Sequence, residues 1–334
     1  MPPRPQRRLV VYVPHRLPAW RLPDDCLEKI RRRARPRFEV EVPGSEAAFV
    51  RVLPSAEVLF AWGLARRHVE KAAQLRWMHT PLSGVDRVLN PELQTTPIRV
   101  TCSRGINSVA AAEHALGLIL SLTRGIAMAA RAQASREWAQ DAIYGRKPAI
   151  DELRGKLLGT IGFGEIGREL AVRARAFGLS VWGMARTARA KPDELDRLLG
   201  ADKLDLMMRS ADILVLALPL TPATQGLIGE RQLKRMKPGA LLINIGRGGL
   251  VQESALVRAL REGWIAGAGL DVFAAEPLPA SSPLWTLPQV VITPHVAGMH
   301  PHYMERAADL FLANLKRYVA GEPLQHEVDP ATGY

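Results

Sequence analysis

The sequence contains little cysteine. Among its 334 residues only Cys26 and Cys102 are cysteines, and they stand far apart, outside any C-x-x-C or C-x-x-H spacing. Neither a disulfide framework nor a zinc or other metal site is therefore expected. A reducing, cytoplasmic setting is the simplest expectation for such a chain.

Long apolar runs are also missing. The first run, Leu9–Val13, is short and is followed by Pro14, which does not fit the apolar core of a signal peptide. The most apolar later window, Ala110–Thr123, contains Glu113 and His114 and is too short to span a bilayer. No membrane attachment is expected.

Acidic residues are outnumbered, with 33 Asp and Glu against 45 Lys and Arg, and the net charge is +12. Such an excess occurs in nucleic-acid-binding proteins, and also in enzymes whose substrate and cofactor are anions. The arginines are scattered, and the dense cluster Arg31–Arg37 has no interleaved aromatic side chains. We therefore expect no nucleic-acid partner. A steep salt dependence of duplex binding would contradict this expectation.

The chain is longer than the ~250–300 residues at which a single core stops growing, so two domains are expected. In both halves, short β-rich runs alternate with helical patterns, which predicts the α/β class with parallel sheets. The expected strands are Leu9–Val13, Phe38–Val42, Val58–Ala61, Leu75–His79, Ile98–Thr101, Leu157–Gly162, Ser180–Met184, Ile213–Leu218, Ala240–Asn244, Ala266–Leu270 and Val290–Thr293. The expected helices are Asp24–Arg35, Arg66–Ala73, a long one over Ser108–Ala134, Glu165–Phe177 and Tyr303–Ala320.

A glycine-rich turn joins the strand ending at Ile161 to the helix that follows it. Its sequence, Gly162-Phe163-Gly164-Glu165-Ile166-Gly167, fits G-x-G-x-x-G between a strand and a helix, the context in which this pattern binds a dinucleotide. The first glycine permits the tight turn, the second lets backbone N–H groups approach a pyrophosphate, and the third lets the helix pack on the strand. The helix N-terminus adds partial positive charge.

The position that normally binds the ribose hydroxyls lies after the next strand, about 20 residues on. Here it is Ala185, and Arg186 and Thr187 follow it. Without a carboxylate, a 2′-phosphate meets no repulsion, and an arginine can pair with it. We therefore expect NADP(H) to be favoured, with NAD(H) also possible. The alternative is that Arg186 is a solvated loop residue and the enzyme accepts both.

Three later segments each place an ionisable residue just after an expected strand, where open parallel sheets bind their ligands. The first runs from Met236 to Val251 and contains N-x-G-R-G. The second is Gly269–Leu278, with D-V-F-x-x-E-P-L. The third is Thr293–Gly298, which begins T-P-H.

In this order, the glycine turn and the three segments resemble the D-isomer-specific 2-hydroxyacid dehydrogenase family, and within it the glyoxylate/hydroxypyruvate reductases. The resemblance is continuous from about Leu75 onward. It implies an NAD(P)-dependent oxidoreductase acting on CH–OH groups, which transfers a hydride between NAD(P)H and C2 of a small 2-oxoacid, glyoxylate or hydroxypyruvate being favoured.

The resemblance also implies two Rossmann-like, doubly wound parallel-sheet domains with a cleft between them. Residues 1–103 plus 297–334 would form the substrate-binding domain, and residues 104–296 the dinucleotide-binding domain. The family's members imply a homodimer, with Ala112–His114 on the helix that builds its interface.

Three residues carry the family's catalytic roles. Arg247 would hold the substrate carboxylate and 2-oxo oxygen, for which a planar guanidinium is suited. His295 would give that oxygen a proton and take one back in the reverse direction, as histidine does near neutral pH. Glu276 would hydrogen-bond the imidazole and fix its tautomer.

Further binding residues follow from the same resemblance. Ser83, Gly84 and Val85 match the loop whose backbone N–H groups bind the substrate carboxylate. Asp271 would meet the nicotinamide carboxamide. The remaining residues that line the cofactor would be Pro219, Thr224, Ile245 and Gly246.

Several alternatives stay open. Glu276 argues against the formate-oxidising relatives, which carry glutamine there, and no regulatory domain is expected after the last helix, unlike in the longer phosphoglycerate dehydrogenases. A dinucleotide-sensing scaffold like the family's corepressor members would use the same fold. The sequence does not assign roles to Trp138, His300 and His302.

Overall fold

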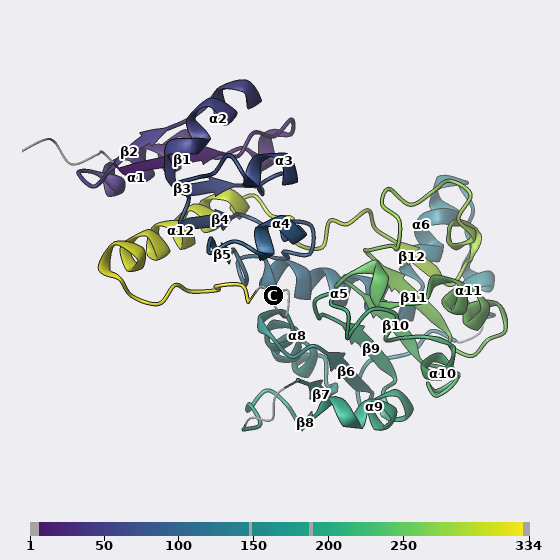
Figure 1. Cartoon of the computed structure of the whole chain (residues 1–334). Coiled ribbons are helices and arrows are strands. Elements are labelled where there is room, and N and C mark those ends of the chain that lie inside the picture. Colours follow the sequence, from purple (N-terminus) through teal and green to yellow (C-terminus); the bar gives the residue numbers. More distant parts are fainter. Residues whose placement is uncertain (1–6, 147–148, 187–189, 330–334) are drawn as a thin grey trace, which may run out of the picture. The chain divides into compact units, whose positions relative to one another are not determined.

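The chain forms two compact α/β units in a computed structural model, which describes residues 7–146, 149–186 and 190–329. Unit 1 comprises residues 1–107 and 300–334, and unit 2 comprises residues 108–299. Figure 1 traces the chain from the purple strands of unit 1 through unit 2 to the yellow helix that belongs again to unit 1.

Unit 1 is built on a parallel sheet with the strand order β2-β1-β3-β4-β5. This is the flavodoxin-like order of a doubly wound domain. The strands are β1 (Arg7–Tyr12), β2 (Phe38–Glu41), β3 (Ala56–Ala61), β4 (Trp77–Thr80) and β5 (Arg99–Cys102). The helices are α1 (Asp24–Ala34), α2 (Glu46–Val52), α3 (Arg66–Val69), α4 (Pro91–Gln94) and α12 (Tyr303–Ala320).

Both faces of this sheet are covered, because side chains alternate along each strand. Leu9 and Val11 of β1 pack into one core, and Val10 between them packs into the other. Helices α1 and α12 cover the first face, where the ring of Phe311 stacks on those of Phe60 and Trp77, at centroid distances of 4.7 and 5.3 Å. The last helix therefore fills the core of the sheet that the first residues form.

Unit 2 has a seven-stranded parallel sheet with the order β12-β11-β10-β9-β6-β7-β8. The order reverses between β6 and β9, which is the switch point of a Rossmann sheet, where dinucleotides bind. The strands are β6 (Leu157–Ile161), β7 (Ser180–Met184), β8 (Arg197–Leu199), β9 (Ile213–Leu216), β10 (Leu241–Asn244), β11 (Gly267–Leu270) and β12 (Val290–Ile292). Together the two sheets confirm the predicted pair of doubly wound parallel-sheet domains.

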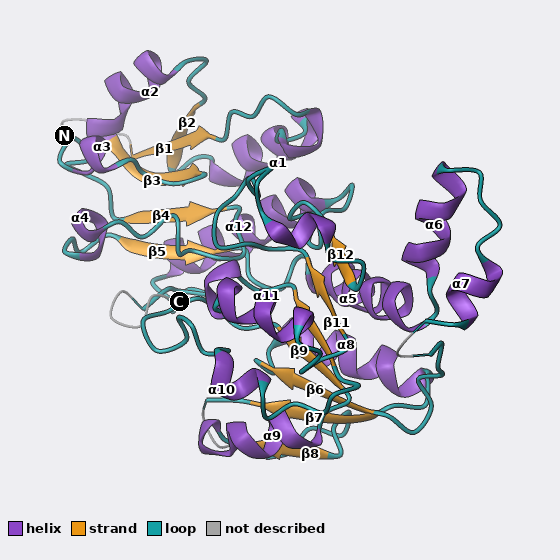
Figure 2. Ribbon diagram, turned by 90° about the vertical axis from the view of Figure 1, so that its right-hand side faces the viewer, coloured by secondary structure: helices purple, strands orange, loops and turns teal. Residues whose placement is uncertain are grey.

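Helices lie on both faces of the second sheet as well (Figure 2). Helices α5 (Ser108–Thr123) and α8 (Glu165–Ala176) share one core, and α9 (Leu204–Ser210), α10 (Glu230–Leu233) and α11 (Glu253–Arg261) share the other. Helices α6 (Ile126–Ala134) and α7 (Gln140–Tyr144) contain no buried residue and stand away from the sheet in Figure 2.

The expectation of one long helix over Ser108–Ala134 is wrong. Two helices occupy the segment, and they are bent by 74° relative to one another. Between them Gly125 has φ 71°, a left-handed conformation that glycine adopts without steric cost and that ends a helix. The sequence pattern did not reveal this break, because alanine and leucine, which favour helices, surround it.

No single helix among the described residues is both long and apolar enough to cross a membrane, and only the bent pair α5–α6, taken together, reaches the required length and composition. Cys26 and Cys102 are both buried and unbonded to each other. Within the same described ranges, no group of three or more His, Cys, Asp or Glu side chains comes together as metal ligands would.

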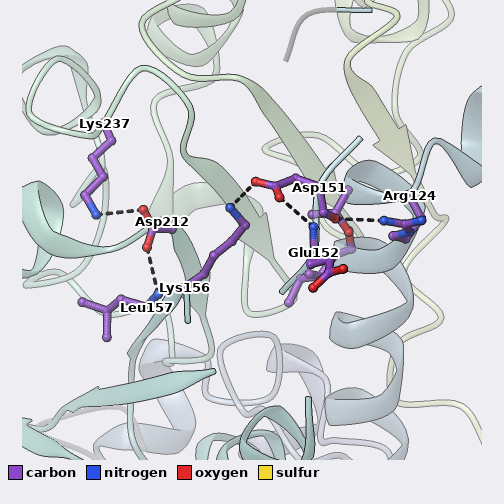
Figure 3. A network of polar contacts seen from close by, with 9 residues as sticks. Arg124, Asp151, Glu152, Lys156, Leu157, Asp212 and Lys237 are labelled. Carbon is purple, nitrogen blue, oxygen red and sulfur yellow. Dashed lines mark hydrogen bonds and ion pairs between the residues drawn. The ribbon is translucent and has the colours of Figure 1, made fainter. Parts of the chain in front are cut away.

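A network of charged side chains joins the amino ends of the strands of unit 2, opposite the glycine turn (Figure 3). Asp212, just before β9, accepts hydrogen bonds from the Leu157 N–H of β6 at 2.8 Å and from Lys237 Nζ at 2.7 Å. Lys156 Nζ contacts Asp151 Oδ2 at 2.5 Å. Because each of these lysines lies against a carboxylate, we interpret the network as structural.

Candidate active site

The candidate residues of unit 2 all follow the carboxyl ends of its strands. The glycine turn follows β6, Arg186 follows β7, and Pro219 follows β9. The Arg247 loop follows β10, Asp271 follows β11, and His295 follows β12. Because every strand pair in this sheet is parallel, these residues are gathered on one edge.

The glycine turn is held by close backbone contacts. Gly162 has φ 94°, and a Cβ placed on it would lie 2.5 Å from the Ala217 carbonyl oxygen. A Cβ on Gly167 would lie 2.9 Å from the Gly162 carbonyl oxygen. The N–H groups of Gly162 and Phe163 both donate to the Met184 carbonyl of β7, at 3.1 and 2.9 Å. Side chains are therefore excluded at two of the three motif glycines.

Gly164 differs from the other two glycines because the space beside it is open. Apart from atoms of its two chain neighbours, no heavy atom of the described residues lies within 4 Å of the position its Cβ would take. It is the N-cap of α8, and no side chain there caps the helix. An exposed helix N-terminus with room beside its second glycine fits an anionic pyrophosphate. Glu165 and Ile166 form the first turn of that helix.

At the ribose position, the structure describes Ala185 and Arg186. Ala185 is half-buried, and its N–H donates to the Leu199 carbonyl of β8 at 3.0 Å. Arg186 is exposed. Thr187, which was also expected to line the cofactor, lies outside the described residues.

The loop after β9 is folded by a threonine hydroxyl. Thr224 Oγ1 donates to the Pro219 carbonyl at 2.8 Å and accepts from the Thr221 N–H at the same distance. Pro219 itself is exposed. The hydroxyl therefore shapes the loop at this edge of the sheet.

A buried asparagine shapes the loop that carries Arg247. Asn244, at the end of β10, accepts from the Gly246 N–H at 3.1 Å and donates to the Arg247 carbonyl at 2.9 Å. Ile245, between them, is buried in the core under α5 and α8. The Arg247 guanidinium donates to the Gly246 carbonyl at 2.8 Å and is half-buried.

The Arg247 loop lies directly against the segment that leads to Glu276. A Cβ on Gly248 would overlap the Phe273 carbonyl carbon, at 1.8 Å, so only glycine permits this approach. The Phe273 N–H in turn donates to Glu276 Oε1 at 3.1 Å. The two predicted catalytic loops are thus joined by backbone contacts.

His295 and Glu276 form a hydrogen-bonded pair. Nδ1 of His295 lies 2.8 Å from Glu276 Oε2. The imidazole side chain is 43% exposed and the glutamate side chain 14%, so solvent and substrate reach the histidine more readily. Since the carboxylate accepts at Nδ1, the other ring nitrogen, Nε2, is directed away from the glutamate. This arrangement suits proton transfer to a substrate atom.

Asp271 is buried and its carboxylate holds the backbone of the His295 loop. Oδ1 accepts from the Val296 N–H at 2.9 Å and from the Thr293 hydroxyl at 2.7 Å, and Oδ2 accepts from the Ala297 N–H at 2.9 Å. The His295 N–H donates to the Asp271 carbonyl at 2.8 Å, and the histidine has φ 54°. Asp271 thereby fixes a strained, left-handed residue in place.

Sequence reasoning missed this positioning role of Asp271 and the contribution of two neighbours. Thr293 also contacts His114 Nε2 of α5, at 2.8 Å, so that helix supports the same loop. Asn244 belonged to the N-x-G-R-G pattern but had no role. The available signal was the place of Asn244 at the end of a strand, two residues before a glycine.

The predicted substrate loop, with Ser83, Gly84 and Val85, lies in unit 1 after β4. Ser83 and Gly84 are half-buried and Val85 is buried. Ser83 Oγ lies 3.0 Å from the Ser103 carbonyl and 3.1 Å from Asn107 Oδ1. The loop is therefore anchored at its first candidate residue.

Trp138, His300 and His302, to which the sequence assigned no role, differ in their exposure and contacts. Trp138 is 89% exposed, between α6 and α7. His302 is exposed and pairs with Glu305, whereas His300 Nε2 lies 3.1 Å from the Ile106 carbonyl. Burial lowers the pKa of His300.

Comparison with known proteins identifies the family to which the chain belongs. Residues 116–297 match the model of the family described as D-isomer specific 2-hydroxyacid dehydrogenase, NAD binding domain. A curated protein of Thermococcus litoralis named glyoxylate reductase is 38% identical over 259 residues, which cover 76% of this chain and 77% of that protein.

Solved structures are similar over nearly the whole chain. A D-isomer specific 2-hydroxyacid dehydrogenase from Xanthobacter autotrophicus, in complex with NADPH and MES, has a TM-score of 0.82 and 29% identity, covering 97% of this chain and 99% of that one. An NADPH-dependent glyoxylate/hydroxypyruvate reductase from Sinorhizobium meliloti, in complex with NADP and sulfate, has a TM-score of 0.80 and 26% identity, covering 98% and 100%.

Proposed function

Because this chain belongs to the D-isomer specific 2-hydroxyacid dehydrogenase family and is an NAD(P)-dependent 2-oxoacid reductase, we propose that glyoxylate or hydroxypyruvate is its substrate and NADPH its preferred reductant. The glyoxylate reductase of Thermococcus litoralis and the glyoxylate/hydroxypyruvate reductase of Sinorhizobium meliloti support this choice of substrate. The observation that carries the proposal is the His295–Glu276 pair beside the Arg247 loop.

The catalytic roles follow from the contacts of each side chain. The nicotinamide, when bound, supplies a hydride to C2 of the 2-oxoacid. The proposed proton donor is His295 Nε2, which gives its proton to the 2-oxo oxygen while Glu276 holds the imidazole at Nδ1. The Arg247 guanidinium binds the substrate oxygens and stabilises the negative charge that develops there. Asp271 keeps His295 in position through the backbone of its loop, and a contact with the nicotinamide carboxamide stays part of the proposal.

The two units divide the binding work in this proposal. The proposed dinucleotide-binding domain, residues 104–296, binds the dinucleotide at the glycine turn, Pro219, Thr224, Ile245 and Gly246. The proposed substrate-binding domain, residues 1–103 plus 297–334, binds the substrate carboxylate through backbone N–H groups of Ser83, Gly84 and Val85. Each of the sites lies at the carboxyl edge of a parallel sheet, where such folds bind ligands.

The proposed function is tested by nicotinamide absorbance with a panel of 2-oxoacids, using NADPH and NADH in parallel. We expect turnover of glyoxylate or hydroxypyruvate, with kcat/KM about tenfold or more higher with NADPH, since Ala185 removes the carboxylate and Arg186 adds positive charge. Replacing Arg186 with alanine should lower kcat/KM with NADPH and leave that with NADH nearly unchanged.

One result would contradict the proposed cofactor preference, and another would contradict the proposed reductase activity. Equal or better kcat/KM with NADH would remove the cofactor preference and leave the reductase. Absence of turnover with every 2-oxoacid, despite measurable NADPH binding, would favour the dinucleotide-sensing scaffold.

Gly164→Ala is expected to raise the Kd for NADPH about tenfold, because the added methyl group occupies the open space in which backbone N–H groups would approach the pyrophosphate. The melting temperature should fall by only a few degrees at most, since apart from the chain neighbours nothing in the described protein lies within 4 Å of that methyl group and alanine is a somewhat poorer N-cap than glycine. Titration of NADPH fluorescence measures the Kd. Gly239→Ala is the matched control, because its Cβ also meets open space but lies at the amino end of β10. If Gly164→Ala bound NADPH as tightly as Gly239→Ala and the wild type, the pyrophosphate would have to bind elsewhere.

We further propose that the enzyme is a cytoplasmic homodimer. Ile126, Trp138 and Tyr144 on and between α6 and α7 are 52%, 89% and 67% exposed, and large apolar side chains exposed on neighbouring elements are candidates for a subunit contact. The two cysteines, buried and unpaired, suit a reducing compartment.

A further inference from the structure

A chain of hydrogen bonds runs through the interior of unit 1 toward the substrate loop. It begins at the Trp77 indole on β4, whose Nε1 lies 2.8 Å from Thr101 Oγ1 on β5. Thr101 Oγ1 lies 2.7 Å from Nδ1 of His79. Nε2 of His79 lies 3.0 Å from Ser103 Oγ, which is 3.2 Å from the Thr80 carbonyl. We call these residues the His79 chain.

The groups at the two ends of the His79 chain determine which atom donates and which accepts in each of its hydrogen bonds. The indole N–H only donates, so Thr101 Oγ1 accepts from it and can give its own proton to Nδ1 of His79. At the other end the Thr80 carbonyl only accepts, so the Ser103 hydroxyl donates to it. Ser103 Oγ then accepts from Nε2–H of His79. Every donor has an acceptor in this arrangement, with His79 as the Nε2–H tautomer.

His79 is fixed in place and uncharged. Its side chain is fully buried, and that burial lowers its pKa to about 3. The rings of Phe60 and Phe311 lie with centroids 5.6 Å from the imidazole. A neutral imidazole between packed rings acts as a rigid link that donates at one end and accepts at the other.

Ser103 connects this link to the substrate loop. Its N–H donates to the Leu82 carbonyl at 2.9 Å, and its carbonyl accepts from the Ser83 hydroxyl at 3.0 Å. Thr80 Oγ1, at the end of β4, accepts from the Leu82 N–H at 3.3 Å. Ser103 therefore contacts His79 through its side chain and the first two loop residues through its backbone.

We propose that His79 is a positioning residue that holds the substrate-binding loop, through Ser103, in the conformation that presents the backbone N–H groups of Ser83, Gly84 and Val85. The inference rests on the proposed function, because it takes this loop to bind the 2-oxoacid carboxylate. The competing explanation is that His79 only fills the core. The two differ in what happens to the loop when the Ser103 contact alone is lost.

The experiment compares four variants of the full chain. His79→Leu removes both hydrogen bonds, and His79→Gln retains one donor and one acceptor. Ser103→Ala removes the loop-side partner with a smaller change in volume, which keeps the test open if His79→Leu does not fold. Thr101→Val is the matched control, since it breaks the His79 chain at the end away from the loop.

The first measurement is hydrogen–deuterium exchange of peptides that carry the Leu82 and Ser103 amides. We expect exchange to be about tenfold faster in His79→Leu and Ser103→Ala, as the loss of one buried hydrogen bond would produce, and within about twofold of wild type in His79→Gln. Thr101→Val should lower the denaturation midpoint without accelerating exchange at these amides. The proposal would be overturned if exchange at these amides were accelerated equally in Thr101→Val, or if it were not accelerated in His79→Leu and Ser103→Ala.

The second measurement is steady-state kinetics with the 2-oxoacid and with NADPH. His79→Leu and Ser103→Ala should raise KM for the 2-oxoacid about tenfold while KM for NADPH and kcat change by less than about twofold, and His79→Gln should restore KM. A parallel fall in kcat, or an unchanged KM, would contradict the proposal. If wild type reduces no 2-oxoacid, the proposed function fails, whereas the exchange measurement still decides whether His79 positions the loop.

Discussion

His295→Ala is expected to lower kcat for 2-oxoacid reduction by about 10²–10⁴, the range contributed by a positioned general acid. The variant removes the imidazole that pairs with Glu276 Oε2 and that is the proposed proton donor to the 2-oxo oxygen. KM for NADPH should change little, because the glycine turn on β6 is untouched. Initial rates at saturating substrate and cofactor, followed by nicotinamide absorbance, measure the loss.

Two variants accompany this prediction. Glu276→Gln keeps an oxygen that can accept from Nδ1 but removes the charge that favours the imidazolium, so a smaller loss, of about 10–10², is expected. His302→Ala removes an exposed histidine, just before α12, that pairs with Glu305 of that helix, and it should leave kcat unchanged. Retention of more than about a tenth of kcat in His295→Ala would show that another group supplies the proton.

Arg247→Ala should lower kcat/KM for the 2-oxoacid by about 10³, because the variant would lose both the proposed contact with the substrate carboxylate and the positive charge proposed to lie beside the reacting oxygen. Arg247→Lys restores a positive charge without the planar fork of donors and should recover only part of the loss. Steady-state kinetics with varied 2-oxoacid at saturating NADPH measures both.

Arg258→Ala is the matched control for the arginine series. Arg258 lies on α11, pairs with Glu230 and covers the Trp264 ring, so its loss should leave kcat/KM unchanged. If Arg247→Lys proved as active as wild type, bidentate binding by the guanidinium would be refuted and a point charge would suffice.

Much of the fold could be predicted because its signals are local. Each of the expected strands has a counterpart in the structure, and helix α12 has the predicted bounds Tyr303–Ala320. Strand β8, Arg197–Leu199, was not predicted, because it is a short edge strand without a buried residue and so lacks an apolar run. The break at Gly125 was missed because a single glycine within an alanine-rich segment is tolerated in many helices.

For the site, too, the features signalled by local motifs could be predicted, and the contacts between residues far apart in sequence could not. The pairing of His295 with Glu276 could be predicted from ordered motifs, each at the end of a strand. The contacts of Asp271 could not, because its carboxylate binds backbone N–H groups of residues 25 and 26 positions away. The His79 chain was missed for a similar reason, since it joins two strands whose register the sequence does not state.

The return of α12 to unit 1 has a consequence for how the chain acquires its structure during synthesis. Phe311 completes the core between Phe60 and Trp77, and the buried Asn314 side chain exchanges two hydrogen bonds with the backbone of Gln325. During synthesis the first sheet therefore emerges with one apolar face covered only in part, by α1, and α12, which completes that cover, is made only after all of unit 2. Unit 2 is continuous in sequence and can fold first. Until α12 is made, residues 1–107 stay incompletely folded and are exposed to chaperones and proteases.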